Sequence, residues 1–447
     1  MTPKKPAPKK DDAPAKKAPS PIAPPRGMRD LLPADQPYWK HVRSTCESVA
    51  SAYGFDRIET PIVEETNLFV RGVGKATDIV EKEMYAFETT GGEKLCLRPE
   101  GTASIMRAYI HNGMLNLPQP VKMWYEGPMF RHDRPQHGRY RQFSQFGCEV
   151  IGEDDAIVDA QLALMCHIIL KELGVDSVIR INSIGTPESR VNYKNALVSY
   201  FRTKRAKFSD EDKKRLLKNP LRILDSKDPA IAELKAEAPQ IVDWLDEESK
   251  THFMRVLEFL DEASVPYQLD PYLVRGLDYY SKTVFEVYAQ SDDQELAQAA
   301  LGGGGRYDGL SEVLGGRPTP AAGFALGLDR IVSRMRELNV AVPSQSIDVF
   351  VAQLGEQGKK RALAMFEELR KSGIKAGEAF AKEAIKAQME IANRRNAKWA
   401  IIVGQKEVLD GTAIIRDMDA GTQEIVDARK IVHEMKKKLG LNGTVQA

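Results

Sequence analysis

Apolar and polar positions follow two different periods along the chain, which predicts a mixture of helices and strands. An apolar residue at every third or fourth position predicts helices over 36–52 and about 154–173, each followed by a glycine that suits a helix end. Two β-like runs at 121–130 and 140–151 flank a polar loop and predict a long hairpin. Shorter strands are predicted at 55–63, 178–182, 269–274 and 283–290.

Residues from about 187 to 262 differ from the rest of the chain. They are rich in Lys and Glu, contain no glycine, and follow a helical period that prolines interrupt. We interpret them as a helical insertion. A glycine cluster at 302–305 and a predicted helix near 327–338 follow, and 339–346 have the composition of a linker.

Beyond this linker, apolar strands alternate with helices. The strands are predicted at 347–354, 374–380, 399–404 and 412–418, and the helices at 358–372, 382–396 and 422–439. This alternation predicts a small α/β domain with parallel strand pairing. We therefore expect two domains, 26–342 and 343–447, preceded by a separate tail, 1–25.

Composition excludes several classes of protein. The 447 residues are 42% hydrophobic and 28% charged, which is enough apolar chain for a sizeable core in two or three domains. No apolar run approaches the roughly 18 residues that cross a bilayer, and none resembles a secretory leader. The four cysteines have no CxxC spacing, so we expect reduced thiols in a cytoplasmic protein and no metal site.

The formal net charge of +1 is the sum of three differently charged parts. Residues 1–25 hold eight prolines and six lysines and carry +4, a composition that predicts disorder. Residues 343–447 also carry +4, which leaves −7 for 26–342. A uniformly basic nucleic-acid binder is excluded, whereas basic surfaces for RNA at the two ends are not.

The arginine-rich loop, residues 131–141, lies between the two strands of the predicted hairpin. It holds four arginines within eleven residues, and a planar guanidinium suits phosphate and carboxylate groups. An exposed basic turn is the alternative. On the return strand, Gln145 and Glu149 project to one face with Phe143 and Gly147, which predicts the wall of a pocket that is open beside Gly147.

Two glycine-rich segments do not fit the common phosphate-binding loops. Residues 71–77 lack the Ser or Thr that follows Lys in a P-loop, and 302–305 lack the spacing of a dinucleotide-binding motif. Glycines at 302–305 would let a strand approach a ligand closely, although a purely structural bulge would also use them. We expect any nucleotide to be held by another arrangement.

Five short segments of the chain, taken together with their order and spacing, resemble the sequence signatures of a known family. Three of them are Gly54–Pro61, Phe130–Asp133 and Gly323–Arg330, and two more are Leu273–Tyr280 and Leu301–Gly309. The first three resemble the signatures of class II aminoacyl-tRNA synthetases. The last two are similar to the private signatures of the histidyl-tRNA synthetase family.

This resemblance extends from about Arg26, including the opening Gly-Met-Arg-Asp at 27–30, to the C-terminus. It implies an α+β catalytic domain with an antiparallel sheet flanked by helices, and a C-terminal α/β anticodon-binding domain. It implies that histidine and ATP form histidyl-adenylate and pyrophosphate, and that histidine then passes to the 3′ end of tRNA(His), which releases AMP. It also implies Mg²⁺ accompanying ATP, no organic cofactor, and a homodimer with Pro61 at the interface.

The resemblance further assigns roles in the reaction. Arg131 and Arg275 would be catalytic, with Arg131 on the α-phosphate and Arg275 on both phosphate and carboxylate. Arg330 and Arg139 would hold the adenine face and the outer phosphates. Asp133 stands where the class usually has Glu, which leaves its role open. The implied ATP-binding residues are Arg131, Asp133, Arg139 and Arg330.

Histidine selection requires groups that recognise an imidazole ring. The resemblance assigns Glu149 and Tyr280 to the ring, and Glu100, Thr102 and Gln145 to the α-amino group. The implied histidine-binding residues are Glu100, Gly101, Thr102, Arg131, Gln145, Glu149, Arg275, Tyr279 and Tyr280.

Two other functions compete with the enzyme. A catalytically inactive paralogue, the regulatory subunit that accompanies ATP phosphoribosyltransferase, typically lacks the anticodon-binding domain and an intact Arg-Gly-Leu-Asp-Tyr-Tyr, which is present here at 275–280. A non-catalytic RNA-binding protein would not need Arg131, Gln145, Glu149 and Arg275 together. Both comparisons favour the enzyme.

Overall fold

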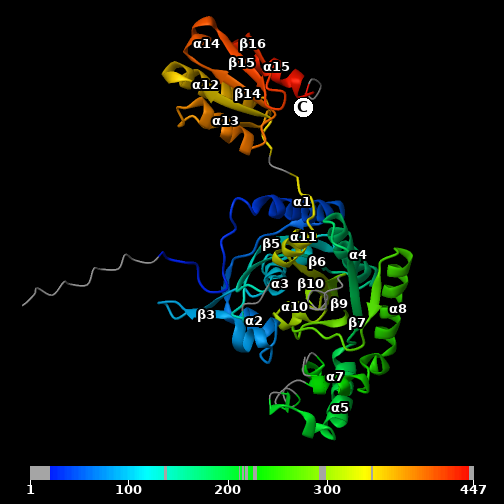
Figure 1. Ribbon diagram of the computed structural model, residues 1–447. Helices are drawn as coiled ribbons and strands as arrows, with labels where there is room; N and C mark the ends of the chain where they lie inside the picture. Colours follow the sequence, from blue (N-terminus) through cyan, green and yellow to red (C-terminus); the bar gives the residue numbers. More distant parts are fainter. Residues whose placement is uncertain are drawn as a thin grey trace, which may run out of the picture. The chain divides into compact units, whose positions relative to one another are not determined.

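Two compact units make up the chain, with the division between Ala341 and Val342, and each is described by itself. Of the predicted tail, residues 21–25 are exposed and have no regular structure, and the prediction for 1–20 lies outside the described residues. The computed structural model (Figure 1) describes residues 21–134, 138–210, 212–213, 216, 220–224, 229–290, 299–343 and 346–441.

An eight-stranded sheet forms the centre of the first unit. In sheet order its strands are β1 (Asp56–Arg57), β5 (Val121–Phe130), β6 (Gln142–Ile151), β11 (Ala321–Gly327), β10 (Ala300–Arg306), β9 (Ser281–Ala289), β7 (Ser177–Ser183) and β8 (Tyr267–Leu269). The six central strands are antiparallel, and only the short edge strands β1 and β8 pair in parallel. The antiparallel sheet and the hairpin of β5 and β6 are thus confirmed.

Helices α1 (Gln36–Ala52), α4 (Ala156–Glu172) and α11 (Leu328–Glu337) pack against one face of this sheet (Figure 1). The predictions for α1 and α4 are confirmed. Asp155 caps α4 by accepting a hydrogen bond from the Ile157 backbone N–H at 3.0 Å, which satisfies one of the free donors of the first turn.

Residues of β6 alternate between the two faces of the sheet. Cys148 is buried on the helical face, beside Cys46 of α1 and Cys166 of α4. Gln145 and Glu149 have the opposite parity, so they project from the other face, as predicted. This second face carries the site described below.

The strand predicted at 55–63 is wrong as a single element. The backbone N–H of Ile58 still donates to Trp124 O at 2.9 Å, but Pro61 has no N–H to continue the ladder. The chain instead enters a separate antiparallel sheet of β2 (Val63–Glu65), β4 (Lys94–Leu97) and β3 (Tyr85–Glu88). Helices α2 (Thr66–Gly72), α3 (Thr102–His111) and α10 (Leu310–Val313) pack together beside it.

The strand predicted at 269–274 is also wrong, because β8 ends at Leu269. The Asp270 carboxylate accepts a hydrogen bond from the Tyr272 backbone N–H at 3.1 Å, and Leu273 N donates to Asp270 O at 3.0 Å. Such a turn, stabilised by an Asp side chain, reverses the chain and stops the strand. It delivers Arg275 and the two tyrosines after it to the site.

The described part of the predicted insertion is helical. It contains α5 (Pro187–Arg202), α7 (Pro229–Ala236) and α8 (Glu247–Glu262), together with short 3₁₀ turns at Arg205–Lys207, Pro220–Ile223 and Ile241–Trp244. Helix α8 packs along α4 and contacts β7 and β9, and Arg255 on α8 forms an ion pair with Asp155 at 3.0 Å. Helix α8, at the end of the predicted insertion, therefore packs as part of the sheet domain.

The second unit is a five-stranded mixed sheet in the order β13 (Ala376–Glu378), β12 (Val349–Gln353), β14 (Trp399–Val403), β15 (Thr412–Asp417) and β16 (Gln423–Asp427). Its helices are α12 (Gly355–Lys371), α13 (Ile385–Arg394), α14 (Gln405–Asp410) and α15 (Ile431–Lys438). Alternate residues of β12 enter separate apolar clusters, so both faces of the sheet are buried.

Parallel pairing is confirmed only for β12 with β13 and β14. β15 pairs antiparallel with β14 and β16, and 423–427 form a strand where a helix was predicted. The Asp417 carboxylate accepts hydrogen bonds from the backbone N–H groups of Asp419 and Ala420, and Gly421 has φ +71°. This tight turn returns the chain as a hairpin.

Across the described residues of both units, no helix has the length and hydropathy needed to cross a membrane.

Candidate active site

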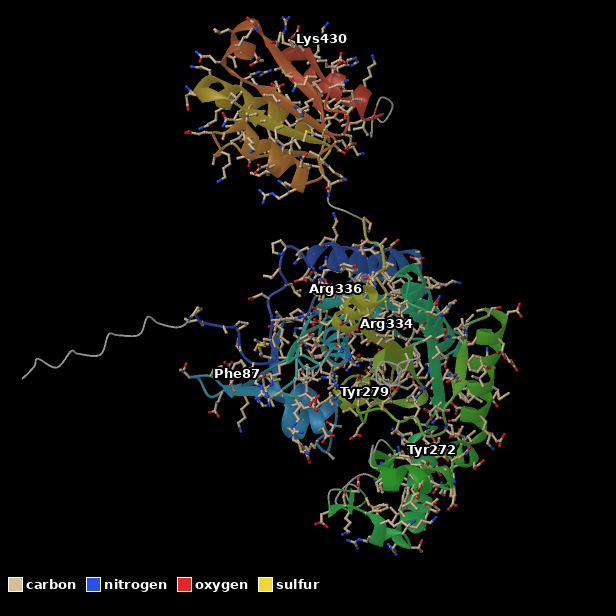
Figure 2. All side chains as sticks on the ribbon, in the orientation of Figure 1. Phe87, Tyr272, Tyr279, Arg334, Arg336 and Lys430 are labelled. Carbon is tan, nitrogen blue, oxygen red and sulfur yellow. The ribbon has the colours of Figure 1, made fainter. Side chains whose placement is uncertain are left out.

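The predicted site residues from distant parts of the first unit lie close together. Arg131, after β5, interacts electrostatically with Glu100, Tyr279 and Arg275. Arg330, on α11, interacts with Arg131 and with Arg139 in the arginine-rich loop. Figure 2 shows Tyr279 within the first unit, on the segment that follows the turn after β8. The arginines that the resemblance assigned to catalysis and to ATP thus form one cationic cluster.

Glu149 occupies the most enclosed position in this site. It is 0% exposed, and its carboxylate accepts hydrogen bonds from Thr102 Oγ1 at 2.7 Å and from the Tyr307 hydroxyl. Burial raises the pKa of the Glu149 carboxyl to about 8, and the two hydrogen bonds oppose this rise. A carboxyl with a pKa of about 8 is mostly protonated at pH 7.

The pocket wall differs from the sequence prediction at Gly147. The space beside Gly147 is filled, because a Cβ there would lie 2.5 Å from Tyr125 Cζ. A Cβ on Gly101 would lie 2.3 Å from the same atom. The Tyr125 ring is held between these two glycines, so they serve the packing of an aromatic wall. Across the sheet, a Cβ on Gly323 would lie 1.7 Å from Glu149 Oε2, so only glycine leaves room for that carboxylate.

The residues assigned to the α-amino group lie beside Glu149. Both carboxylate oxygens of Glu100 accept hydrogen bonds from the first turn of α3, from Thr102 N at 2.8 Å and Ala103 N at 2.9 Å. The Tyr279 hydroxyl donates to Glu100 at 3.4 Å. Gln145 Oε1 is buried and has no hydrogen-bond partner among the described residues. A buried acceptor without a partner suits an incoming ammonium group.

Arg275 is held by a carboxylate that sequence reasoning missed. Its Nη1 pairs with Glu286 Oε1 on β9, and the Tyr288 hydroxyl donates to the other oxygen of Glu286. Burial opposes the charged form, yet Glu286 keeps the pKa of the Arg275 guanidinium above its usual value. A Cβ on Gly303 would lie 2.7 Å from Arg275 Nη1, so the glycine strand makes room for this side chain.

The residues assigned to ATP are more exposed than those around Glu149. Asp133 pairs with Arg139 at 3.2 Å, and the side chains are 39% and 47% exposed. Arg330 donates from Nε to Gly138 O at 3.1 Å and from Nη1 to Ala300 O at 2.5 Å. Burial lowers the pKa of Arg330, and the neighbouring guanidinium of Arg139 lowers it further. Positive charge is therefore concentrated around these arginines, and guanidinium groups suit phosphate.

The structure adds Tyr307 and Glu286 to the predicted set. Tyr307 belongs to the Leu301–Gly309 signature, and its ring meets the Tyr279 ring edge to face at 5.6 Å between centroids. Because Tyr307 lies within that signature, the sequence alone could have placed it in the site. Glu286 lies in an ordinary amphipathic strand, where nothing in the local sequence distinguishes it from a solvated polar residue.

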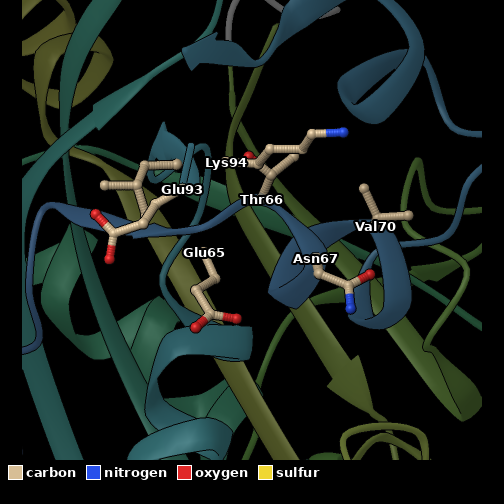
Figure 3. Close-up of a pocket in the computed structure, with 7 residues that line it drawn as sticks. Glu65, Thr66, Asn67, Val70, Glu93 and Lys94 are labelled. Atoms are coloured by element: carbon tan, nitrogen blue, oxygen red, sulfur yellow. The ribbon is translucent and has the colours of Figure 1, made fainter. Parts of the chain in front are cut away.

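One cavity of the first unit lies next to the arginine cluster, and another lies apart from it. One of about 670 Å³ adjoins Tyr279 and is lined also by Arg190, Asp278 and Lys282. Another, of about 460 Å³, lies between β2, α2 and β4 and is lined by Glu65, Thr66, Asn67, Val70, Glu93, Lys94 and Leu95 (Figure 3). No predicted site residue lines this second cavity.

Comparison with known proteins shows which protein family the chain is similar to. A family model of histidyl-tRNA synthetase matches residues 27–185 and 196–331, and a model of an anticodon binding domain matches 348–438. A histidine–tRNA ligase of Dehalococcoides mccartyi is 44% identical over 417 residues, which are 93% of this chain and 99% of that protein. One from Pelotomaculum thermopropionicum is 43% identical over 417 residues, 93% of this chain and 97% of that protein.

A solved structure gives the same result. The crystal structure of apo S. aureus histidyl-tRNA synthetase has a TM-score of 0.78 and 36% sequence identity, and the match covers 93% of this chain and 100% of that chain. The antiparallel sheet and the arginine cluster on its open face define a class II aminoacyl-tRNA synthetase. Within that class, the chain belongs to the histidyl-tRNA synthetase family. The family and fold class predicted from the sequence are confirmed.

The raised pKa of Glu149 predicts how stability depends on pH. A carboxyl whose pKa is higher in the folded chain binds extra protons on folding, so its contribution to stability is greatest below its ordinary pKa, 4.5, and is lost as the pH rises through about 8. A Glu149→Gln variant cannot titrate there. Between pH 6 and pH 9 the wild type should lose about 2–3 kcal/mol more unfolding free energy than the variant.

Urea unfolding at the two pH values measures this difference. Glu126→Gln is the matched control, because Glu126 is a carboxylate on the neighbouring strand that pairs with Arg43 at 3.0 Å. The control should keep the wild-type dependence on pH. Equal losses in the wild type and Glu149→Gln would show that Glu149 does not bind the extra proton.

Proposed function

We propose that the chain is a histidine–tRNA ligase, which activates histidine with ATP and transfers it to the 3′ end of tRNA(His). One observation carries this proposal: a fully buried carboxylate, Glu149, lies on the same sheet face as the arginines 131 and 275. An imidazole ring needs such a buried polar partner, and the reaction of a carboxylate with an α-phosphate needs the positive charge.

Histidine enters with its ring toward Glu149 and its charged end toward Gln145. Glu149 and Tyr280 recognise the two ring nitrogens, and Tyr279 packs against Tyr280 with 4.8 Å between ring centroids. The unpartnered Gln145 Oε1 accepts from the α-ammonium group, as do Glu100 and the lone pairs of Thr102 Oγ1. An analogue without the ring nitrogens would offer Glu149 and Tyr280 no hydrogen bond, which disfavours its binding strongly.

ATP binds across the cationic cluster. Arg131 contacts the α-phosphate, and Arg275 contacts both this phosphate and the histidine carboxylate, so two anions are held together for in-line attack without a protein nucleophile. Arg139 binds the outer phosphates, which arrive with Mg²⁺ as part of the substrate. Arg330 packs against the adenine. Asp133, whose arm is shorter than that of Glu, releases Arg139 and contacts the adenine through water.

The second unit binds the tRNA, consistent with its match to an anticodon binding domain. Its +4 charge favours contacts to phosphates, which position RNA without reading its sequence. Because charged tRNA is used in translation, the proposed ligase acts in the cytoplasm.

The ligase is proposed to be a homodimer. Ile62 and Val63, which follow Pro61, are 42% and 40% exposed, and Phe87 on β3, labelled in Figure 2, is 44% exposed. They belong to the small sheet or its approach, and a second copy would cover them.

Histidine-dependent exchange of pyrophosphate into ATP tests the ligase proposal. The full chain should catalyse exchange with histidine, and discrimination against amino acids without an imidazole should be roughly 10⁴-fold. Assaying all twenty amino acids with folded, ATP-supplied protein measures this. If no amino acid supports exchange, the proposal fails and the regulatory paralogue becomes the better explanation.

Substitution at Arg275 should lower the rate far more than ATP affinity. Arg275→Ala removes charge at the reacting groups and should slow exchange by roughly 10²–10³-fold. Glu286→Gln should slow it about tenfold, because Arg275 is no longer held. The double variant should be no slower than Arg275→Ala alone.

Glu64→Gln controls for general damage to an ion pair, because Glu64 pairs with Arg107 in a part of the domain away from Arg275. Its effect should add to that of Arg275→Ala. Additive effects of Glu286→Gln and Arg275→Ala would instead mean that Glu286 acts independently of Arg275.

The proposed dimer predicts a mass of twice 49.9 kDa in light scattering. Phe87→Glu places a charge on the exposed apolar patch and should shift the protein to the monomer. Leu409→Glu, which changes a leucine that is 81% exposed in the second unit, should not. A wild type that is monomeric at micromolar concentration would contradict the dimer.

A further inference from the structure

The Gly-Met-Arg-Asp segment at 27–30 has no part in the reaction proposed above, yet it lies against the arginine-rich loop. Gly27, with φ +85°, directs its carbonyl to accept a hydrogen bond from the Arg141 backbone N–H at 2.7 Å. The Arg141 side chain donates to Arg26 O at 3.4 Å and to Asp133 O at 3.2 Å. The segment is therefore fixed to the end of the loop that leads into β6.

Arg29 adds two side-chain contacts at the same place. Its guanidinium carbon lies 4.2 Å from the centroid of the Tyr140 ring, within the range of a cation–π interaction. Its Nη2 forms an ion pair with Asp329 Oδ1 at 2.8 Å, in which the two side chains are 33% and 7% exposed. This partly desolvated pair should resist salt better than a fully exposed one.

Asp329 links Arg29 to two parts of the ATP site. Its second oxygen accepts a hydrogen bond from the Ser144 backbone N–H at 2.7 Å, at the start of β6. The next residue along α11 is Arg330, which donates from Nε to Gly138 O at 3.1 Å. The Arg29 guanidinium therefore contacts the loop at Tyr140, and it contacts Asp329, the residue next to Arg330 on α11.

We propose that Arg29 is a positioning residue for ATP, which holds the end of the arginine-rich loop and the start of α11 at a fixed separation. This inference rests on the proposed ligase function. Arg29 touches no residue assigned to histidine, so it acts on the nucleotide side alone. A displacement of about 1 Å between groups that grip one substrate is enough to reduce binding or rate substantially.

Arg29→Ala should raise the KM for ATP about tenfold in pyrophosphate exchange and leave the KM for histidine within about twofold of the wild type. Arg29→Lys should recover only part of the loss, because an ammonium keeps the charge opposite Asp329 but lacks the planar group that stacks on Tyr140. The double variant Arg29→Ala, Asp329→Asn should have the same KM for ATP as Arg29→Ala, because both substitutions remove one link.

Arg43→Ala is the matched control. Arg43 also combines one ion pair, with Glu126 at 3.0 Å, and one aromatic contact, 5.2 Å from the Trp39 ring. It has no contact with the described residues of the arginine-rich loop, 131–134 and 138–141. It should leave both KM values unchanged. The urea midpoint of each variant shows that the protein remains folded.

Titration calorimetry with ATP provides a readout that does not depend on turnover. Weaker ATP binding by Arg29→Ala, but not by Arg43→Ala, supports the proposal even if the wild type fails to catalyse exchange. Unchanged ATP affinity and KM in folded Arg29→Ala would overturn it. So would an equal rise in the KM for histidine, because the residue would then support the whole domain.

Discussion

The hydrogen bonds to Glu149 are the interactions on which the geometry of the site depends. A carboxyl group with 0% exposure loses its hydration, and the partners that offset this loss come from Thr102 at the start of α3 and Tyr307 after β10. Gly323 on β11 leaves the space that the carboxylate fills. Three elements distant in the sequence must therefore pack correctly before Glu149 can be buried. The same packing fixes where an imidazole could bind.

The nucleotide side follows a different physical rule. Arg139 and Asp133 are about half exposed, so their ion pair contributes little, about 0–1 kcal/mol, and can be exchanged for a phosphate at small cost. Arg275 is more enclosed, and its pair with Glu286 keeps the guanidinium charged and oriented before any substrate arrives. The rigid, hydrogen-bonded surroundings of Glu149 thus adjoin a cationic surface whose partners are replaceable. This division suits a substrate pair of one small ring and one flexible polyphosphate.

The sequence predicted the elements whose signals are local. The hairpin of β5 and β6, helix α4 and the parity of Gln145 and Glu149 follow from short-range periodicity. The residues that the family resemblance assigned to the site lie close together in the first unit. Strand β16 was predicted as a helix because its apolar pattern is short and its turn depends on the Asp417 side chain. Glu286 was missed for a related reason. Its role exists only because the turn after β8 brings Arg275 across the sheet, and no local pattern encodes that meeting.

The glycine run at 302–305 shows how a local signal can be correct while its cause lies elsewhere. Close approach to a ligand and a structural bulge were both open from the sequence. The register of β10 against β9 does shift between Gly305 and Arg306, where Gly305 has φ +151°. A Cβ at Gly303 would lie 2.5 Å from the Phe285 carbonyl oxygen and 2.7 Å from Arg275 Nη1, so both the neighbouring strand and the guanidinium require glycine there. A Cβ at Gly302, Gly304 or Gly305 would likewise meet a backbone carbonyl oxygen of a neighbouring strand, at 2.5, 2.2 and 2.3 Å. The run is therefore explained mainly by the close packing of strands, and Gly303 in addition leaves room for Arg275.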